Sequence, residues 1–179
     1  MIQFQYLFLI TLVNLVPLSL ETSFADDNLP SCWHSARVKL LGGDAIGGVK
    51  MGVTPAEVVS ILGKPSIKRK AQKEENIWTM VWGWNAHSSE IGFSGSSPKK
   101  MKVVGISIAK PSKLKTKKGI GIGSSFGNVS AAYPDGRIVC TQLPECKIKN
   151  YLIDGDCGMT FDSGEDGVGA IYWGADTGP

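Results

Sequence analysis

Histidine is scarce in this sequence, and the residue patterns of common metal and nucleophilic sites are missing as well. The two histidines, His34 and His87, stand far apart, and no two cysteines form a CxxC pair. A zinc site needs clustered Cys and His ligands, and nucleophilic catalysis needs a nucleophile, a base and an orienting group within mutual reach. We therefore expect no catalytic residue, no metal and no cofactor. A small hydrolase that uses His87 is the least favoured function.

No apolar run is long enough for a clear membrane span, which needs about 20 residues. One shorter run, residues 6–20, precedes Ser23-Phe24-Ala25, which has the small-x-small spacing of a cleavage site. This pattern predicts a secretory signal peptide over residues 1–25. The first five residues contain no Lys or Arg, so an uncleaved anchor stays open. After cleavage we expect no stable membrane insertion, lipidation at Cys32 is disfavoured, and the location is periplasmic or extracellular.

Four cysteines would remain in the mature chain, and an even number in an exported protein favours disulfide bonds over metal binding. They are Cys32, Cys140, Cys146 and Cys157. Three pairings are possible. Cys140 and Cys146 flank a short loop and can meet easily, which would leave Cys32 to pair with Cys157.

Charge is unevenly distributed along the chain. Residues 26–118 contain 16 Lys/Arg and 7 Asp/Glu, a net charge of +9, whereas residues 119–179 contain 3 and 8, a net charge of −5. A basic half with tryptophans would suit nucleic acid. Export and the acidic second half argue against that partner. The asymmetry instead suits steering toward an oppositely charged partner or two solvated faces of opposite sign.

Two segments of the chain are similar at a spacing of 71 residues. GGVKMGVTPAEVVSILGKP (47–65) aligns with KGIGIGSSFGNVSAAYPDG (118–136). Such self-similarity predicts two copies of one supersecondary unit. We expect an N-terminal arm at 26–44, a first repeat at 45–109, a basic linker or exposed edge at 110–117, and a second repeat at 118–174.

Each copy has the signals of a short helix followed by strands. In the first, Thr54 is a candidate N-cap, Pro55 follows it, Glu57 completes a capping box and Gly63 ends the helix. In the second, Ser125 is the cap. Extended segments are expected at 77–84, 90–93 and 102–108, and again at 147–153, 158–161 and 167–173. The predicted fold class is α+β, with two tandem repeats that each pack a short helix on an antiparallel sheet of three to four strands.

Two loops have partial resemblance to ligand-binding motifs. Asp162 and Asp166 have the spacing of a calcium loop, but Trp173 stands where the bidentate Glu is needed, so a hairpin turn is favoured. GIGIGSSFG (119–127) lacks the GK[ST] ending of a phosphate loop, so a tight entry into the second helix explains its glycines better.

The segment IWTMVWGW (77–84) would place Trp78, Met80, Trp82 and Trp84 on one face of a strand. The small β-branched residues of the other face would suit the helix, which predicts that the tryptophans face outward as a binding surface. The alternative is that the tryptophans form the core.

The glycine-flanked helix entry, the Trp-rich strand and the KVVGISI strand (102–108), all duplicated, resemble the tandem domain of β-lactamase inhibitory protein and the single-copy outer-membrane assembly lipoproteins of the BamE (SmpA/OmlA) group. The resemblance covers residues 45–174. It implies two helix-plus-sheet units that grip a protein through a concave aromatic face. Carried over, Trp78, Trp82 and Trp84 would belong to that face, with Tyr151 as the nearest aromatic of the second copy.

The expected function is therefore that of an exported, non-enzymatic module that binds another protein, either as an enzyme inhibitor or as an envelope-assembly scaffold. The alternative is a cell-wall or glycan-binding module in which the tryptophans stack on sugar rings.

Overall fold

The computed structural model describes residues 44–140, 149–153 and 158–174. The predicted signal peptide, nearly all of the N-terminal arm, His34, and Cys32, Cys146 and Cys157 lie outside these residues. Cys140 is disulfide-bonded, and its pairing stays a prediction because the other three cysteines are not described.

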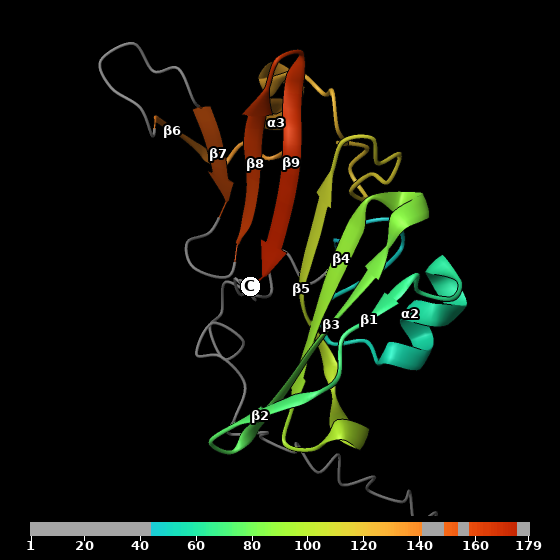
Figure 1. The fold of residues 1–179 in the computed structure, drawn as a ribbon. Helices are drawn as coiled ribbons and strands as arrows, with labels where there is room; N and C mark the ends of the chain where they lie inside the picture. The colour runs from blue at the N-terminus through green and yellow to red at the C-terminus, as the bar shows by residue number, and fades with distance from the viewer. Residues whose placement is uncertain (1–43, 141–148, 154–157, 175–179) are drawn as a thin grey trace, which may run out of the picture.

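The protein is α+β, with one antiparallel sheet of nine strands and two α-helices within the described residues (Figure 1). The strand order is β1-β3-β4-β5-β9-β8-β7-β6, and β2 also pairs with β3. The strands are β1 (Ile67–Lys68), β2 (Gln72–Glu74), β3 (Ile77–Trp84), β4 (Ser89–Gly95), β5 (Lys102–Ala109), β6 (Arg137–Cys140), β7 (Lys149–Ile153), β8 (Met159–Gly164) and β9 (Gly167–Gly174). The helices are α2 (Pro55–Leu62) and α3 (Phe126–Ala132), with short 3-10 turns η2 (Asn85–His87) and η3 (Pro98–Lys100).

Strands β5 and β9 join the two halves of the sheet. Ile106 lies opposite Trp173, and Ile108 lies opposite Ile171. The sequence left open whether the halves form one sheet, because a pairing between strands about 65 residues apart has no local signal. The result is a continuous sheet from β1 to β6.

Both helices begin where the sequence predicts. The Thr54 hydroxyl accepts a hydrogen bond from the Glu57 amide, and the Glu57 carboxylate accepts one from the Thr54 amide at 2.6 Å, which completes the capping box. That backbone hydrogen bond, assisted by the Thr54 hydroxyl, lowers the pKa of Glu57. Gly63 ends α2 with a φ of 78°. Ser125 caps α3 through the amide of Asn128.

Six predicted strands are present, and three more were not expected. Strand β3 has the predicted bounds, and its neighbours differ by one to three residues. Strands β1, β2 and β6 were missed because residues 67–74 are mostly polar and show no alternation, and Arg137–Cys140 is very short. All three lie at the edges of the sheet.

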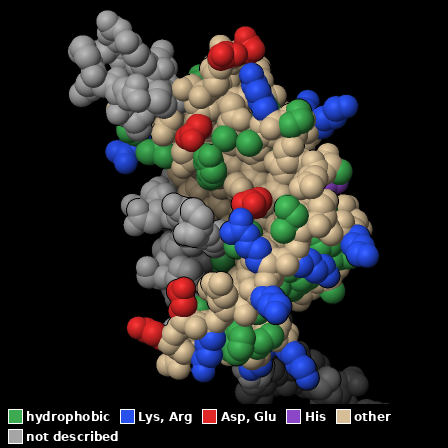
Figure 2. Space-filling view, viewed as in Figure 1, with side chains coloured by type: hydrophobic (Ala, Val, Ile, Leu, Met, Phe, Trp, Pro, Cys, Tyr) green, Lys and Arg blue, Asp and Glu red, His purple; other side chains and the backbone are tan. Residues whose placement is uncertain are grey.

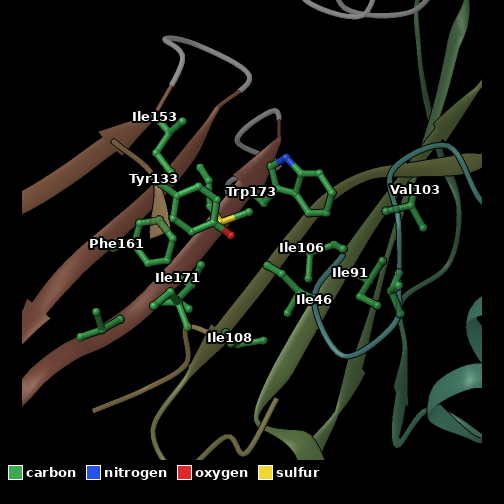
Figure 3. Packing of buried hydrophobic residues seen from close by; sticks show 14 of the residues in the cluster. Ile46, Ile91, Val103, Ile106, Ile108, Tyr133, Ile153, Phe161, Ile171 and Trp173 are labelled. Atoms are coloured by element: carbon green, nitrogen blue, oxygen red, sulfur yellow. The ribbon is translucent and has the colours of Figure 1, made fainter. Parts of the chain in front are cut away.

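One face of the sheet forms the core. We call it the helix side, because both helices pack on it, and we call the opposite face the open side. Figure 3 shows the helix-side residues of both halves in one cluster, in which the Tyr133 and Phe161 rings lie 5.4 Å apart. Fully buried members from the strands include Ile91, Phe93, Met159 and Ile171.

Residues 110–117 were predicted to be a linker or exposed edge, and the structure shows their side chains divided between solvent and core: Lys110, Pro111, Lys113, Lys115 and Lys117 are exposed. Ser112 and Thr116 are buried, and Leu114 packs against the core. The backbone of this segment also pairs with the start of the first half, since Gly47 donates to Lys115 and Lys117 donates to Ala45. These hydrogen bonds hold the segment between the halves against the start of the first half.

Candidate functional site

The tryptophans of β3 lie on the helix side, so the prediction that they face away from the helix is wrong. Trp84 is 2% exposed, and its indole N–H donates a hydrogen bond of 2.9 Å to the carbonyl of Gly63 at the end of α2. The cause is register: Trp82 lies opposite Ile91, which is fully buried. Large indoles also fill the space that one eight-residue helix leaves above the sheet.

Tyr151 is buried as well and cannot belong to an exposed aromatic face. It is 3% exposed, and its hydroxyl donates a 2.6 Å hydrogen bond to the carbonyl of Tyr133, which ends α3. Its ring meets Phe161 edge-on at 6.5 Å. Tyr151 therefore holds β7 to its helix, as Trp84 holds β3.

Trp78, Met80 and Trp82 lie on the same face of β3 as Trp84, but these three side chains are only partly buried. All three pack against the core cluster, and the Trp82 ring meets Phe93 edge-on at 5.1 Å. Trp78 and Trp82 are therefore the two sequence-predicted tryptophans that a partner could still contact. Whether they bind one stays a prediction.

Lysines from the edge strands border these rings. The Lys68 ammonium lies 4.4 Å from the centroid of the Trp82 ring, a distance at which a cation is attracted to an indole face. Lys73 lies directly opposite Trp78 and therefore on the same side of the sheet. Composition alone could not find this arrangement, because β1 and β2 gave no strand signal. We call Lys68, Lys73, Trp78, Met80 and Trp82 the lysine–tryptophan shelf.

The open side carries one strongly exposed aromatic ring. Tyr172 on β9 is 48% exposed and lies between Ser107 of β5 and Thr160 of β8. The other open-side positions of β5 and β9 nearby are small: Gly105, Ala109, Ala170 and Gly174. Figure 2, drawn as Figure 1 with α3 behind β8 and β9, shows charged side chains of both signs scattered around this face. Sequence reasoning chose Tyr151 as the aromatic of the second half and did not single out Tyr172, because β9 is apolar on both faces.

A buried polar cluster connects α3 with the junction of the two halves. The Asp44 carboxylate accepts hydrogen bonds from the Tyr133 hydroxyl and from the amides of Ala45 and Lys117. Burial, with the nearby Asp44 carboxylate, raises the pKa of Tyr133. The Lys118 ammonium lies over the same ring at 4.2 Å and donates to the carbonyl of Ala132. All of these contacts join residues of this chain to one another, so we infer that the cluster stabilises the fold.

The motif-like loops have structural roles. Residues 165–166 form the turn between β8 and β9, as the hairpin prediction required, and burial raises the pKa of Asp162. The expectation that no serine stands in a G-x-S-x-G motif is wrong, because GSSFG (123–127) has that spacing. Its serine, Ser125, is the cap of α3, and no histidine of the described residues hydrogen-bonds to it.

Groups of His, Cys, Asp and Glu able to hold a metal ion are not found within the described residues. Among the same residues, no helix has the length and hydropathy to cross a membrane. Comparison of the chain with family models, with curated proteins and with solved structures found no match.

Proposed function

We propose that this chain is an exported, non-enzymatic module of two tandem repeats that binds another protein through the open side of its sheet. The observation that carries the proposal is the one-sided packing: both helices of the described residues lie on one face, and the opposite face presents Tyr172 at 48% exposure. Tyrosine is one of the residue types enriched at the energetic centres of protein interfaces.

Hydrogen bonds at matching places support the duplication. In the first half, Gly52 donates to Val103 and Val103 donates to Val53, each at 2.9 Å. In the second half, Gly123 donates to Val168 at 2.7 Å, and Val168 donates to Ser124 at 2.9 Å. Gly52 and Gly123 are the same 71 residues apart as the aligned helices. Each half thus attaches the entry of its helix to its last strand in the same way.

Matching irregularities in the two hairpins support it further. The β4–β5 register shifts after Gly92, so that Phe93 faces Val103. The β8–β9 register shifts after Asp162, so that Ser163 faces Val168. Each shift skips one residue of the last strand, immediately after the valine that bonds to the helix entry. Bulges are built-in features of a fold rather than accidents, and two at equivalent places favour a common origin of the halves.

The proposed contact surface differs from the one that the resemblance implies. Trp84 and Tyr151 are buried and are excluded from direct contact. Tyr172 replaces them as the aromatic anchor, with Ser107 and Thr160 beside it. The resemblance to the inhibitor and BamE groups remains part of the proposal, because the unit of one helix followed by an antiparallel meander fits both.

The test is site-specific photo-crosslinking in the organism that makes the protein. We expect p-benzoylphenylalanine in place of Tyr172 to give a discrete protein adduct. The matched control is the same residue in place of Ile61, which is 43% exposed on α2 and should give none. Equal adducts at both positions would contradict the proposal. Retention on cell wall without any protein adduct would support the glycan-binding alternative.

A further inference from the structure

We propose that the lysine–tryptophan shelf and the edge beside it bind an acidic peptide segment in extended conformation, which adds to the sheet along β1 and β2. The inference rests on the proposal that the chain binds proteins. It adds a second contact surface, on the helix side at the opposite end of the strand order from β6, and it states the chemistry of the segment bound there.

The first argument is the open edge. Strands β1 and β2 both pair with β3, and within the described residues no strand lies beyond them. All their residues are exposed. An edge strand presents unpaired N–H and C=O groups, and an extended peptide can bond to them as an added strand.

The second argument is charge. Residues 64–73 contain five basic side chains, and all are exposed: Lys64, Lys68, Arg69, Lys70 and Lys73. No acidic residue lies within this segment, although Glu74 at the end of β2 and Glu75 follow it directly, and Glu90 of β4 lies 3.9 Å from Arg69. Basic side chains still outnumber acidic ones by five to two over residues 64–75. Lysines on an edge also oppose aggregation between sheets. Here Lys68 and Lys73 share a face with Trp82 and Trp78.

The third argument is shape. The shelf lies between two raised elements. Helix α2 covers its Trp84 end, where the indole bonds to Gly63. At the other end, η3 lies on the helix side beside Trp78. Gly95 is the strand partner of Trp78, and a Cβ built on Gly95 would lie 2.6 Å from the carbonyl oxygen of Lys100, the last residue of η3. Both elements lie on the helix side, whereas the residues of β1 and β2 are exposed, so an extended segment can approach this edge in the plane of the sheet.

The floor itself favours a peptide over a sugar. Trp78, Met80 and Trp82 are only partly buried, and Ala71 is another partly buried residue that packs against the same core. Hydroxyl-reading groups such as carboxylates and amides, which would fix a sugar on these rings, are not among the residues of the shelf. Side chains of an added strand alternate between the two faces of the sheet. An alternating acidic and apolar segment can therefore present all its carboxylates to Lys68 and Lys73 on the helix side. Its apolar side chains then lie on the open side, where Ile67 is 48% exposed.

The experiment uses the mature chain and a defined probe, a capped ten-residue peptide of alternating glutamate and valine. We expect saturable binding, a change in tryptophan fluorescence and slower amide hydrogen exchange at residues 67–74. The double change Lys68→Glu and Lys73→Glu should weaken binding about tenfold or more, since it replaces attraction with repulsion. The matched control, Lys50→Glu with Lys113→Glu, makes the same charge change at exposed sites away from the shelf and should leave affinity nearly unchanged.

Two further probes separate strand addition from simple attraction between charges. A peptide with proline in place of alternate valines keeps its charge but cannot donate along a strand, and it should bind far more weakly. Equal binding of that peptide, or of one with lysine in place of glutamate, would overturn the proposal. Binding of vesicles rich in anionic phospholipid without binding of the peptide would also overturn it. A Tyr172 adduct in the absence of peptide binding would leave the proposed function standing and reject this inference alone.

Discussion

The indole N–H of Trp84 donates a 2.9 Å hydrogen bond to the carbonyl oxygen of Gly63, so the last residue of β3 holds the end of α2. Tyr151 holds the end of α3 in the same manner, through the carbonyl of Tyr133. In both halves a buried aromatic donor satisfies a carbonyl at a helix end, where the helix itself supplies no partner.

This relationship predicts a large loss of stability when the indole is removed. Trp84→Phe should lower the free energy of unfolding by about 1–3 kcal/mol, because the Gly63 carbonyl loses its partner. Trp84→Ala should lower it by about 3–5 kcal/mol through the cavity that it leaves. Urea unfolding followed by circular dichroism measures both. Tyr172→Ala is the control and should stay within about 0.5 kcal/mol of the parent. A stable Trp84→Ala variant would contradict the placement of this ring in the core.

Local signals explain what the sequence predicted well. The capping box of α2, its Pro55 and its terminal Gly63 act within a few residues, so the helix bounds follow from neighbours in the chain. The alternation in β3 is local too, and its bounds were predicted correctly. Register, by contrast, depends on which residue of β4 faces which residue of β3, and no local pattern states it.

The direction of the tryptophan face was the main error in the candidate site. The prediction compared the two faces of β3 by side-chain size alone. The deciding residues are Ile91 and Phe93, which lie opposite Trp82 and Met80 and are fully buried. A strand buried next to them must present its tryptophans to the same side. Tyr172 was missed for a related reason, since its strand is apolar on both faces near the β5–β9 junction.

The caps predict a difference between the two helices. Thr54→Ala removes a hydroxyl that takes part in a reciprocal capping box, whereas Ser125→Ala removes one that accepts a single bond from Asn128. Each change should lower the free energy of unfolding by about 1 kcal/mol. The loss at Thr54 should be the larger, because the Glu57 carboxylate also loses the 2.8 Å hydrogen bond from the Thr54 hydroxyl, although it keeps the one from the amide of residue 54. Thermal and urea unfolding of the two variants, with Ser60→Ala as a mid-helix control, measure this order, and a larger loss at Ser125 would contradict it.

Tyr133 predicts a dependence of stability on alkaline pH. Burial and the Asp44 carboxylate raise the pKa of its phenol above the ordinary value of 10.0. The folded state therefore holds this proton more tightly than the unfolded state. The resulting stabilisation is complete below pH 10 and is lost as pH rises from there toward the folded pKa. Tyr133→Phe should show a shallower fall in stability above pH 10 than the parent.

The measured quantity is the difference in the free energy of unfolding between the parent and Tyr133→Phe at each pH. Taking this difference removes the contribution of lysines, which titrate in the same pH range in both proteins. At neutral pH, Tyr133→Phe should also be less stable by about 1–3 kcal/mol, because Asp44 loses a donor. Tyr172→Phe is the control, since its ring is half exposed. The same alkaline slope in the parent and in Tyr133→Phe would show that the Asp44 contact does not hold in solution.

Two glycines with positive φ test how closely β9 approaches its neighbours. Gly174, at 94°, ends β9 opposite Gly105, and a Cβ there would lie 2.2 Å from the Val104 carbonyl oxygen. Gly123 has a φ of 83°, and a Cβ built on it would have no neighbouring atom within 4 Å. Gly123→Ala should therefore cost about 1–2 kcal/mol from backbone strain alone. Gly174→Ala adds an overlap with a backbone atom that cannot rotate away, so it should lower the free energy of unfolding further, by at least about 1 kcal/mol. Equal losses in urea unfolding would mean that the two halves of the sheet meet less tightly at β5 and β9 than their register requires.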